Sequence, residues 1–140
     1  MVMDSIVFGA NEITISGKPQ VLKRTRISGN HCYDSQKSEK LRIYLEVKKQ
    51  WVAYKLPIYM DPIHLDVLFV FPIPESYSVA KKKILKNSPR GIVNDLDNLL
   101  KMLLDSLQGL CFSNDNLVAS INAKKVYGNN AKTVFCFRKL

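Results

Sequence analysis

Six leucines between residues 96 and 107 place the strongest constraint on how this chain can fold. They follow the pattern i, i+3, i+4, i+7, i+8, i+11: Leu96, Leu99, Leu100, Leu103, Leu104 and Leu107. This spacing puts all six on one face of an α-helix, and Gly109, just beyond them, is typical of a helix end. A helix with an apolar face of this length must cover a hydrophobic core. We therefore expect a packed layer to which this helix belongs.

Strand patterns lie on both sides of the leucine-rich segment. Alternating or continuous runs of β-branched and aromatic residues occur at 12–16, 64–71, 117–126 and 132–138; such runs are typical of β-strands. The second run is stopped by Pro72 and Pro74. Its core-facing side is expected to carry Leu65, Val67, Phe69 and Phe71.

Two more helices are expected. Residues 36–55 have a helical period, and a shorter basic helix is predicted over residues 76–87. The residues expected to form the buried face of the longer helix are Leu41, Tyr44, Leu45, Trp51 and Val52. Strands and helices then follow one another in the order expected for a two-layer α/β domain. The 140 residues are enough for one such domain, so we expect a single domain over residues 1–140.

The charge balance points to a polyanionic partner. Twenty-one Lys and Arg residues against twelve Asp and Glu residues give a net charge of +9, which favours nucleic acid or an anionic membrane surface. No apolar run is long enough for a membrane span, and no signal peptide is expected. Three cysteines without metal-binding spacing are expected to be free thiols in a reducing compartment: Cys32, Cys111 and Cys136.

The acids around the leucine-rich helix could form a metal site. Asp95 and Asp97 can converge only if the helix starts there, with Asp95 or its neighbour Asn94 at the non-helical N-cap. Lys101 would lie one turn beyond Asp97, and Asp115 could return beside them if its strand packs on the helix. Three carboxylates at a helix start suit Mg²⁺, which could activate a water and bind a phosphate oxygen.

A purely structural interpretation of the same residues is also open. Acids in a first helical turn are favoured by capping and by the helix dipole. Asp97, Lys101 and Asp105 could form an ion-pair ladder on a solvated face, and Asp115 could be a turn residue. His64, at the start of an apolar strand, is expected to be structural.

The chain resembles the RusA family of Holliday junction resolvases at several motifs. The family pattern D-x-D-N-L-x-K is matched by DLDNLLK at residues 95–101, and its D-A-L-x-G by LDSLQG at 104–109. An acid pair before a strand is matched by ND at 114–115, and the opening strand and basic loop by ISGKP at 15–19 and KRTR at 23–26. The resemblance spans most of the chain, although about twenty-five residues carry it.

The resemblance implies a Mg²⁺-dependent endonuclease, with Mn²⁺ as a substitute, that acts as a homodimer on four-way DNA junctions. Each subunit would nick one of two opposed strands. The implied fold is a mixed sheet with helices on one face. The implied metal ligands are Asp95, Asp97 and Asp115, with Lys101 as the catalytic lysine. The implied setting is the cytoplasm of a bacterial or virus-infected cell.

Basic segments and family positions together predict the DNA contacts. They are Lys18, Lys23, Arg24, Arg26, Lys81, Lys82, Lys83, Lys86, Arg90, Asn98, Lys124 and Lys125. The last two are alternatives for the family's downstream lysine, and Asn98 matches its asparagine.

Three positions depart from the family pattern. Asn114 replaces the first acid of the acid pair, Leu117 replaces a frequent glutamine, and Asn94 stands where proline or a basic residue is common. No metal ligand is lost, but junction selectivity is left open. The alternatives are therefore a less selective Mg²⁺-dependent nuclease of branched DNA and a junction-binding protein without catalysis.

Overall fold

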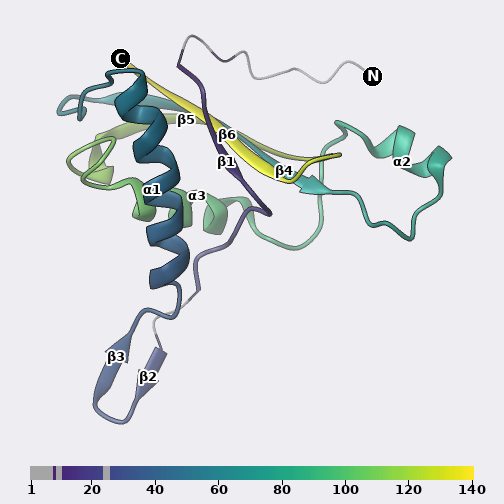
Figure 1. The fold of residues 1–140 in the computed structure, drawn as a ribbon, viewed down its shortest axis with the longest axis horizontal. Helices are drawn as coiled ribbons and strands as arrows, with labels where there is room; N and C mark the ends of the chain where they lie inside the picture. Colours follow the sequence, from purple (N-terminus) through teal and green to yellow (C-terminus); the bar gives the residue numbers. More distant parts are fainter. Residues whose placement is uncertain (1–7, 9–10, 24–25) are drawn as a thin grey trace.

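A four-stranded mixed sheet forms the centre of the computed structural model, which describes residues 8, 11–23 and 26–140 (Figure 1). Its strands are β1 (Ile13–Ser16), β4 (Ile63–Pro72), β5 (Val118–Gly128) and β6 (Lys132–Lys139), in the order β1-β6-β4-β5. β4 and β5 run parallel, and the other two pairings are antiparallel. The mixed sheet and the four predicted strands are confirmed.

Strand β4 lies inside the sheet because it is apolar over almost its whole length. Alternate side chains of a strand share one face, and on β4 this face carries Ile63, Leu65, Val67, Phe69 and Phe71, each at most 2% exposed. Phe135 and Phe137 extend the same core from β6. The predicted core face of this strand is confirmed.

Helices α1 (Lys37–Ala53) and α3 (Leu96–Leu107) cover the core face and complete the second layer. Leu99, Leu103 and Leu107 are buried, as the leucine spacing predicts. None of the helices in the described ranges is long and apolar enough to cross a membrane. The structure is thus an α+β arrangement of two layers, as expected.

The buried face of α1 differs from the prediction. Trp51 is buried as expected, but Ile43 and Val47 accompany it, whereas Leu41, Leu45 and Val52 are 56%, 55% and 63% exposed. The helix carries two apolar stripes, and only one of them can face the sheet. The sequence period identified the helix correctly but selected the wrong stripe.

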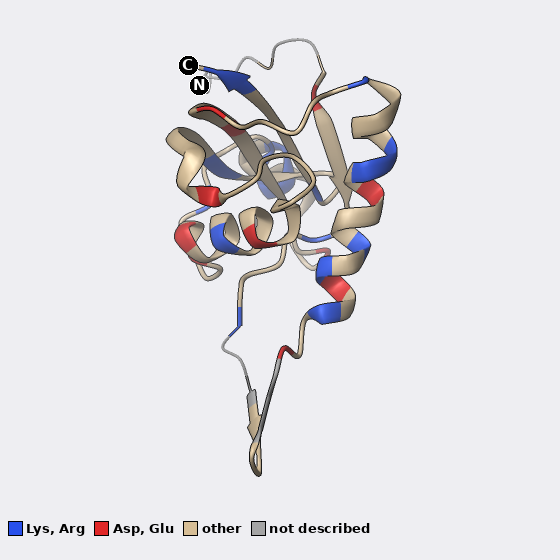
Figure 2. Cartoon of the chain, turned by 90° about the vertical axis from the view of Figure 1, so that its left-hand side faces the viewer, with Lys and Arg blue, Asp and Glu red and all other residues tan. Residues whose placement is uncertain are grey.

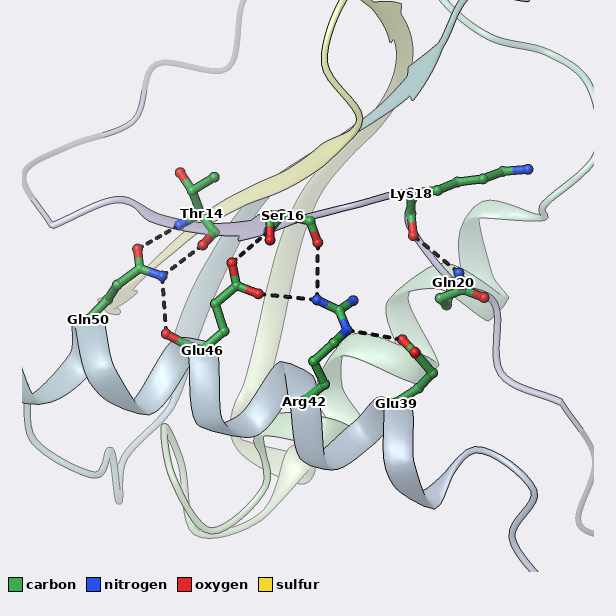
Figure 3. A network of polar contacts seen from close by, with 8 residues as sticks. All are labelled: Thr14, Ser16, Lys18, Gln20, Glu39, Arg42, Glu46 and Gln50. Carbon is green, nitrogen blue, oxygen red and sulfur yellow. Dashed lines mark hydrogen bonds and ion pairs between the residues drawn. The ribbon is translucent and has the colours of Figure 1, made fainter.

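Polar side chains of α1 protect the free edge of β1 (Figure 3). The Gln50 side chain accepts from the backbone N–H of Thr14 at 3.0 Å and donates to the carbonyl of Thr14 at 2.7 Å. Glu46 accepts from the N–H of Ser16, and Arg42 donates to its carbonyl. An unpaired strand edge invites pairing with another chain. Here the neighbouring helix occupies its hydrogen-bonding groups.

Two small elements project from the body (Figure 1). The hairpin of β2 (Arg26–Ser28) and β3 (His31–Tyr33) extends below α1, and α2 (Val79–Leu85) stands away from the sheet with no buried residue. The basic helix α2 is confirmed. The hairpin was not predicted, although Gly29 at its tip, with φ +61°, is a turn signal.

Candidate active site

The first turn of α3 presents two carboxylates. Asp95 is the N-cap residue with extended backbone angles, φ −54° and ψ 134°, and Asp97 lies in the first helical turn. This is the arrangement under which the sequence allows the two acids to converge. The Asp95 side chain makes no capping hydrogen bond, and both residues are exposed. The capping interpretation therefore does not account for Asp95, whose carboxylate oxygens remain available.

Lys101 lies one turn beyond Asp97, on the same side of the helix. Its Nζ is 4.0 Å from an Asp97 carboxylate oxygen, with side chains 61% and 71% exposed. Such an exposed pair contributes little to stability. The positive charge is therefore free to meet an additional anion at the start of the helix.

Asp105 does not extend this pair into a ladder. Its carboxylate is 2.6 Å from Lys40 Nζ of α1, and the same ammonium is 2.6 Å from Asp34. Burial alone would lower the pKa of Lys40, but hydrogen bonds to Asp105 and Asp34 offset this and raise it. The hydrogen bond from Lys40 lowers the pKa of Asp34. Asp105 thus joins α3 to α1. Figure 2 shows that acidic and basic positions alternate along both helices.

Asp115 lies at the other end of the α3 layer. It opens a short 3₁₀ helix, η1 (Asp115–Leu117), directly before β5, and Val118 pairs with Ile63. The start of α3 lies instead beside Lys125, whose Nζ is 3.0 Å from the carbonyl of Asn94. The seven residue-to-residue steps of extended strand from Val118 to Lys125 span about 23 Å. Within one chain, Asp115 is therefore remote from Asp95 and Asp97.

The expected convergence of three carboxylates is thus not formed within one chain. Over the described ranges, no group of three or more His, Cys, Asp or Glu side chains is placed to hold a metal ion. The turn at Asp115 is made by its neighbour, because the Asn114 side chain accepts from the N–H of Asn116 at 2.9 Å. The Asp115 carboxylate is exposed and not used by the turn.

The predicted DNA contacts fall into three groups. Lys18 and Lys23 are exposed on the segment after β1, where Lys18 borders a hollow of about 320 Å³. A second group lies on or just after the projecting helix α2: Lys81, Lys82, Lys83 and Lys86. Arg24 and the side chain of Arg26 lie outside the described part. The third group, around α3 and β5, comprises Arg90, Asn98, Lys124 and Lys125.

Two members of the third group are occupied inside the protein. Arg90 is only 8% exposed, and its guanidinium carbon lies 4.0 Å from the centre of the Phe71 ring. Lys125 Nζ donates to three backbone carbonyls ahead of α3. The sequence predicts DNA contacts for both residues, but it holds no signal for these internal bonds, because they arise only when distant segments meet.

His64 is a hydrogen-bonded residue of the sheet, as expected. Its Nε2 is 2.8 Å from Asp66, two positions along the same strand, and its Nδ1 is 2.5 Å from Ser120, its partner on β5. Side chains two apart on a strand share a face. Sequence reasoning missed the partners of His64, although the spacing from Asp66 is a local signal.

The fold and the acidic helix start define a single-domain α+β protein with a carboxylate pair of the kind that metal-dependent nucleases use. Residues 14–135 match the model of the family described as endodeoxyribonuclease RusA. The chain belongs to this family, and membership indicates endodeoxyribonuclease activity on Holliday junctions. A curated relative, the uncharacterized protein YqaN of Bacillus subtilis (strain 168), is 27% identical over 147 residues, covering 99% of each chain.

Proposed function

We propose that this protein is a Mg²⁺-dependent endonuclease that resolves Holliday junctions by paired symmetric nicks. The observation that carries the proposal is the start of α3. There Asp95 stands at the N-cap without capping the helix, Asp97 follows in the first turn, and Lys101 lies beside Asp97. These positions match the family's motif residue by residue.

The chemistry of the donors fits Mg²⁺. Carboxylate oxygens are hard ligands, and Mg²⁺ is commonly held by one or two carboxylates together with substrate phosphates and waters. Asp95 and Asp97 supply such a pair, and both are exposed to an incoming DNA strand. When bound, the ion would activate a water and offset charge on the leaving oxygen.

Lys101 serves the phosphate in this proposal. Its ammonium group lies one helical turn from the start of α3, 4.0 Å from an Asp97 carboxylate oxygen. A cation at this position orients the scissile phosphate and stabilises the additional negative charge of the transition state. The lysines on or just after α2, together with Lys18 and Lys23, bind the neighbouring phosphates, and these contacts do not depend on the base sequence.

A second copy of the chain supplies Asp115 in the active assembly. Asp115 lies too far from Asp95 to share an ion within one chain, yet it matches the family's third metal ligand. Two nicks related by symmetry also require two sites related by a two-fold axis. A homodimer in which Asp115 of each copy reaches the α3 start of the other meets both demands.

The free edge of β5 offers the surface for this dimer. β4 pairs with one side of β5, and residues 87–90 cover the other side at Lys125–Tyr127. Over residues 118–123, no strand of the described ranges pairs with that second side, and Ile121 is 42% exposed. Antiparallel pairing of two β5 strands about a two-fold axis near Ile121 would carry each Asp115 toward the Lys125 end of its partner. One flank of α3 is also half-buried and apolar: Leu96, Leu100 and Leu104.

The first prediction concerns the carboxylate pair. Asp97→Asn should reduce nicking of a labelled four-way junction by 100-fold or more, on the order of the loss expected for a metal ligand in the reacting centre. Junction binding should be retained or tightened, because a negative charge near the phosphates is removed. Electrophoretic separation of nicked strands measures the first effect, and binding in EDTA measures the second.

The matched control is Glu12→Gln, which removes one negative charge from the exposed segment before β1. It should nick as the parent does. Full activity of Asp97→Asn would contradict the site assignment. Equal cleavage of a four-way junction and a linear duplex would instead favour a less selective nuclease, and tight binding without any cut would favour a junction-binding protein.

A further inference from the structure

Two buried or half-buried cations hold the turn that precedes the site. Lys125 Nζ donates to the carbonyl oxygens of Ile92, Val93 and Asn94 at 3.1, 3.2 and 3.0 Å. Arg90 Nη1 donates to the Ile92 and Val93 carbonyls at 3.2 and 3.0 Å, and to Asn94 Oδ1 at 3.1 Å. An ammonium group has three donors, and here all three are satisfied by one short turn.

The two cations are themselves fixed to the sheet. Lys125 is a residue of β5, and its carbonyl accepts from the backbone N–H of Arg90 at 3.0 Å. The guanidinium carbon of Arg90 is 4.0 Å from the ring centre of Phe71 and 5.9 Å from that of Tyr127. Stacking of this kind orients a planar cation. The turn at residues 92–94 is therefore held by two side chains that are themselves attached to β4 and β5.

The turn has little else to hold it. Ile92 and Val93 are 54% and 71% exposed, and neither belongs to the buried core cluster. Asn94 has φ +65°, a left-handed conformation that glycine adopts freely and asparagine more readily than most other residues. The next residue is Asp95, whose side chain does not cap the helix. The direction of the Asp95 carboxylate thus depends on how the turn is held.

We propose that Arg90 and Lys125 are positioning residues: they clamp the carbonyls of residues 92–94 so that Asp95 is held at the helix start beside Asp97. The catalytic consequence rests on the function proposed above, but the clamp itself does not. This positioning role also explains why two cations of a DNA-binding protein bind backbone oxygens of their own chain and not a DNA phosphate.

The test uses the full chain and hydrogen–deuterium exchange without metal or DNA. Lys125→Met keeps the aliphatic stem and removes the three donors. Loss of charged hydrogen bonds should speed amide exchange at residues 99–101, the first N–H groups bonded within α3, by about tenfold or more, while exchange in β4 and β6 is unchanged. Lys49→Met, an equal charge loss on exposed α1, should leave the 99–101 amides as in the parent. Lys125→Gln keeps two of the donors and is the variant to use in the same measurement if Lys125→Met does not fold.

Kinetics give a second readout. Lys125→Met should lower kcat for junction nicking by roughly 10- to 100-fold, the usual loss for groups that orient metal ligands, while Kd for the junction changes less than about twofold. Lys125→Arg should restore part of kcat. Unchanged exchange at residues 99–101, with weaker junction binding and a shallower salt dependence, would mean that Lys125 contacts phosphate and would overturn the proposal. If the parent protein does not nick junctions, the proposed function fails, but the exchange data still decide whether the clamp exists.

Discussion

A single lysine joins two helices that are distant in the sequence and the short segment before the first of them. Lys40 of α1 pairs with Asp34, before the helix, and with Asp105 near the end of α3. Its side chain is 20% exposed, so the contact is shielded more than an ordinary surface pair. The position of α3 against α1, and with it the direction of the acidic helix start, depends partly on this cation.

The stabilisation by Lys40 should depend on pH. The lowered pKa of Asp34 means that its contribution is present above the unfolded pKa near 3.8 and is lost as the pH falls through the lower folded value. The raised pKa of Lys40 means that its contribution is present below the unfolded pKa near 10.5 and is lost as the pH rises through the folded value. Lys40→Met should therefore lower Tm by a few degrees near neutral pH and by less at pH 3.

Thermal unfolding of Lys40→Met and the parent across this pH range measures the difference. Lys49→Met removes the same charge from the solvent side of α1 and should show no comparable loss. A Tm difference that stays constant from pH 7 to pH 3 would argue against the ion pairs as its source.

At the scale of elements, α1 both packs on the core and occupies the hydrogen-bonding groups at the free edge of β1. Its inner stripe packs on the sheet, while Gln50, Glu46 and Arg42 bond the backbone of β1. β5 lies at the opposite edge of the sheet, and over residues 118–123 no described element pairs with its outer side. This asymmetry closes one edge of the sheet and leaves the other open for the dimer proposed above.

The substitution Gln50→Leu removes the two hydrogen bonds between α1 and the backbone of Thr14 in β1. The N–H and carbonyl of Thr14 then lose their side-chain partner, which should cost about 1–2 kcal/mol of unfolding free energy. Urea denaturation measures the loss, and faster amide exchange at Thr14 locates it. Lys49→Leu places the same side chain one position earlier and should be close to neutral, and equal losses in the two variants would show that the edge bonds are not the cause.

At the scale of the whole molecule, the two ends of α3 lead to a complementation experiment. Asp97→Asn and Asp115→Asn should each be inactive alone. If each site combines Asp97 of one copy with Asp115 of the other, a mixed dimer has one intact site. Statistical mixing should then restore about a quarter of the parental site number, seen as single nicks without paired resolution.

The mixed sample must be prepared by joint refolding or co-expression, so that subunits exchange. A site built within one chain leaves every mixed dimer with two defective sites. Absence of recovered nicking, with mixed dimers demonstrated by mass spectrometry, would therefore reject the shared site.

Much of the fold could be predicted from local patterns. The leucine period of α3 and the apolar alternation of β4 are properties of neighbouring residues, so both were found with the correct faces. The outer stripe of α1 was wrongly assigned to the core, because Leu41 and Leu45 follow a helical period as well as Ile43 and Val47 do. Only the position of the sheet decides between the stripes.

The site was predictable in part for the same reason. Asp95, Asp97 and Lys101 lie within two turns, and their relation follows from helix geometry. The distance of Asp115 depends instead on how α3 and β5 are joined, which no local pattern specifies. The inward bonds of Arg90 and Lys125 likewise depend on segments that meet only after folding.

The place of β6 in the sheet has a consequence for how the chain is made. It lies between β1 and β4, so the first strand of the sheet has no neighbour until the last one has left the ribosome. Before that point α1 and α3 can form as local helices, but the part of the core that β6 supplies is missing. We therefore expect a nascent chain that ends before residue 132 to carry the acidic motif without a fixed site, so that cutting of DNA begins only after synthesis has passed the final strand.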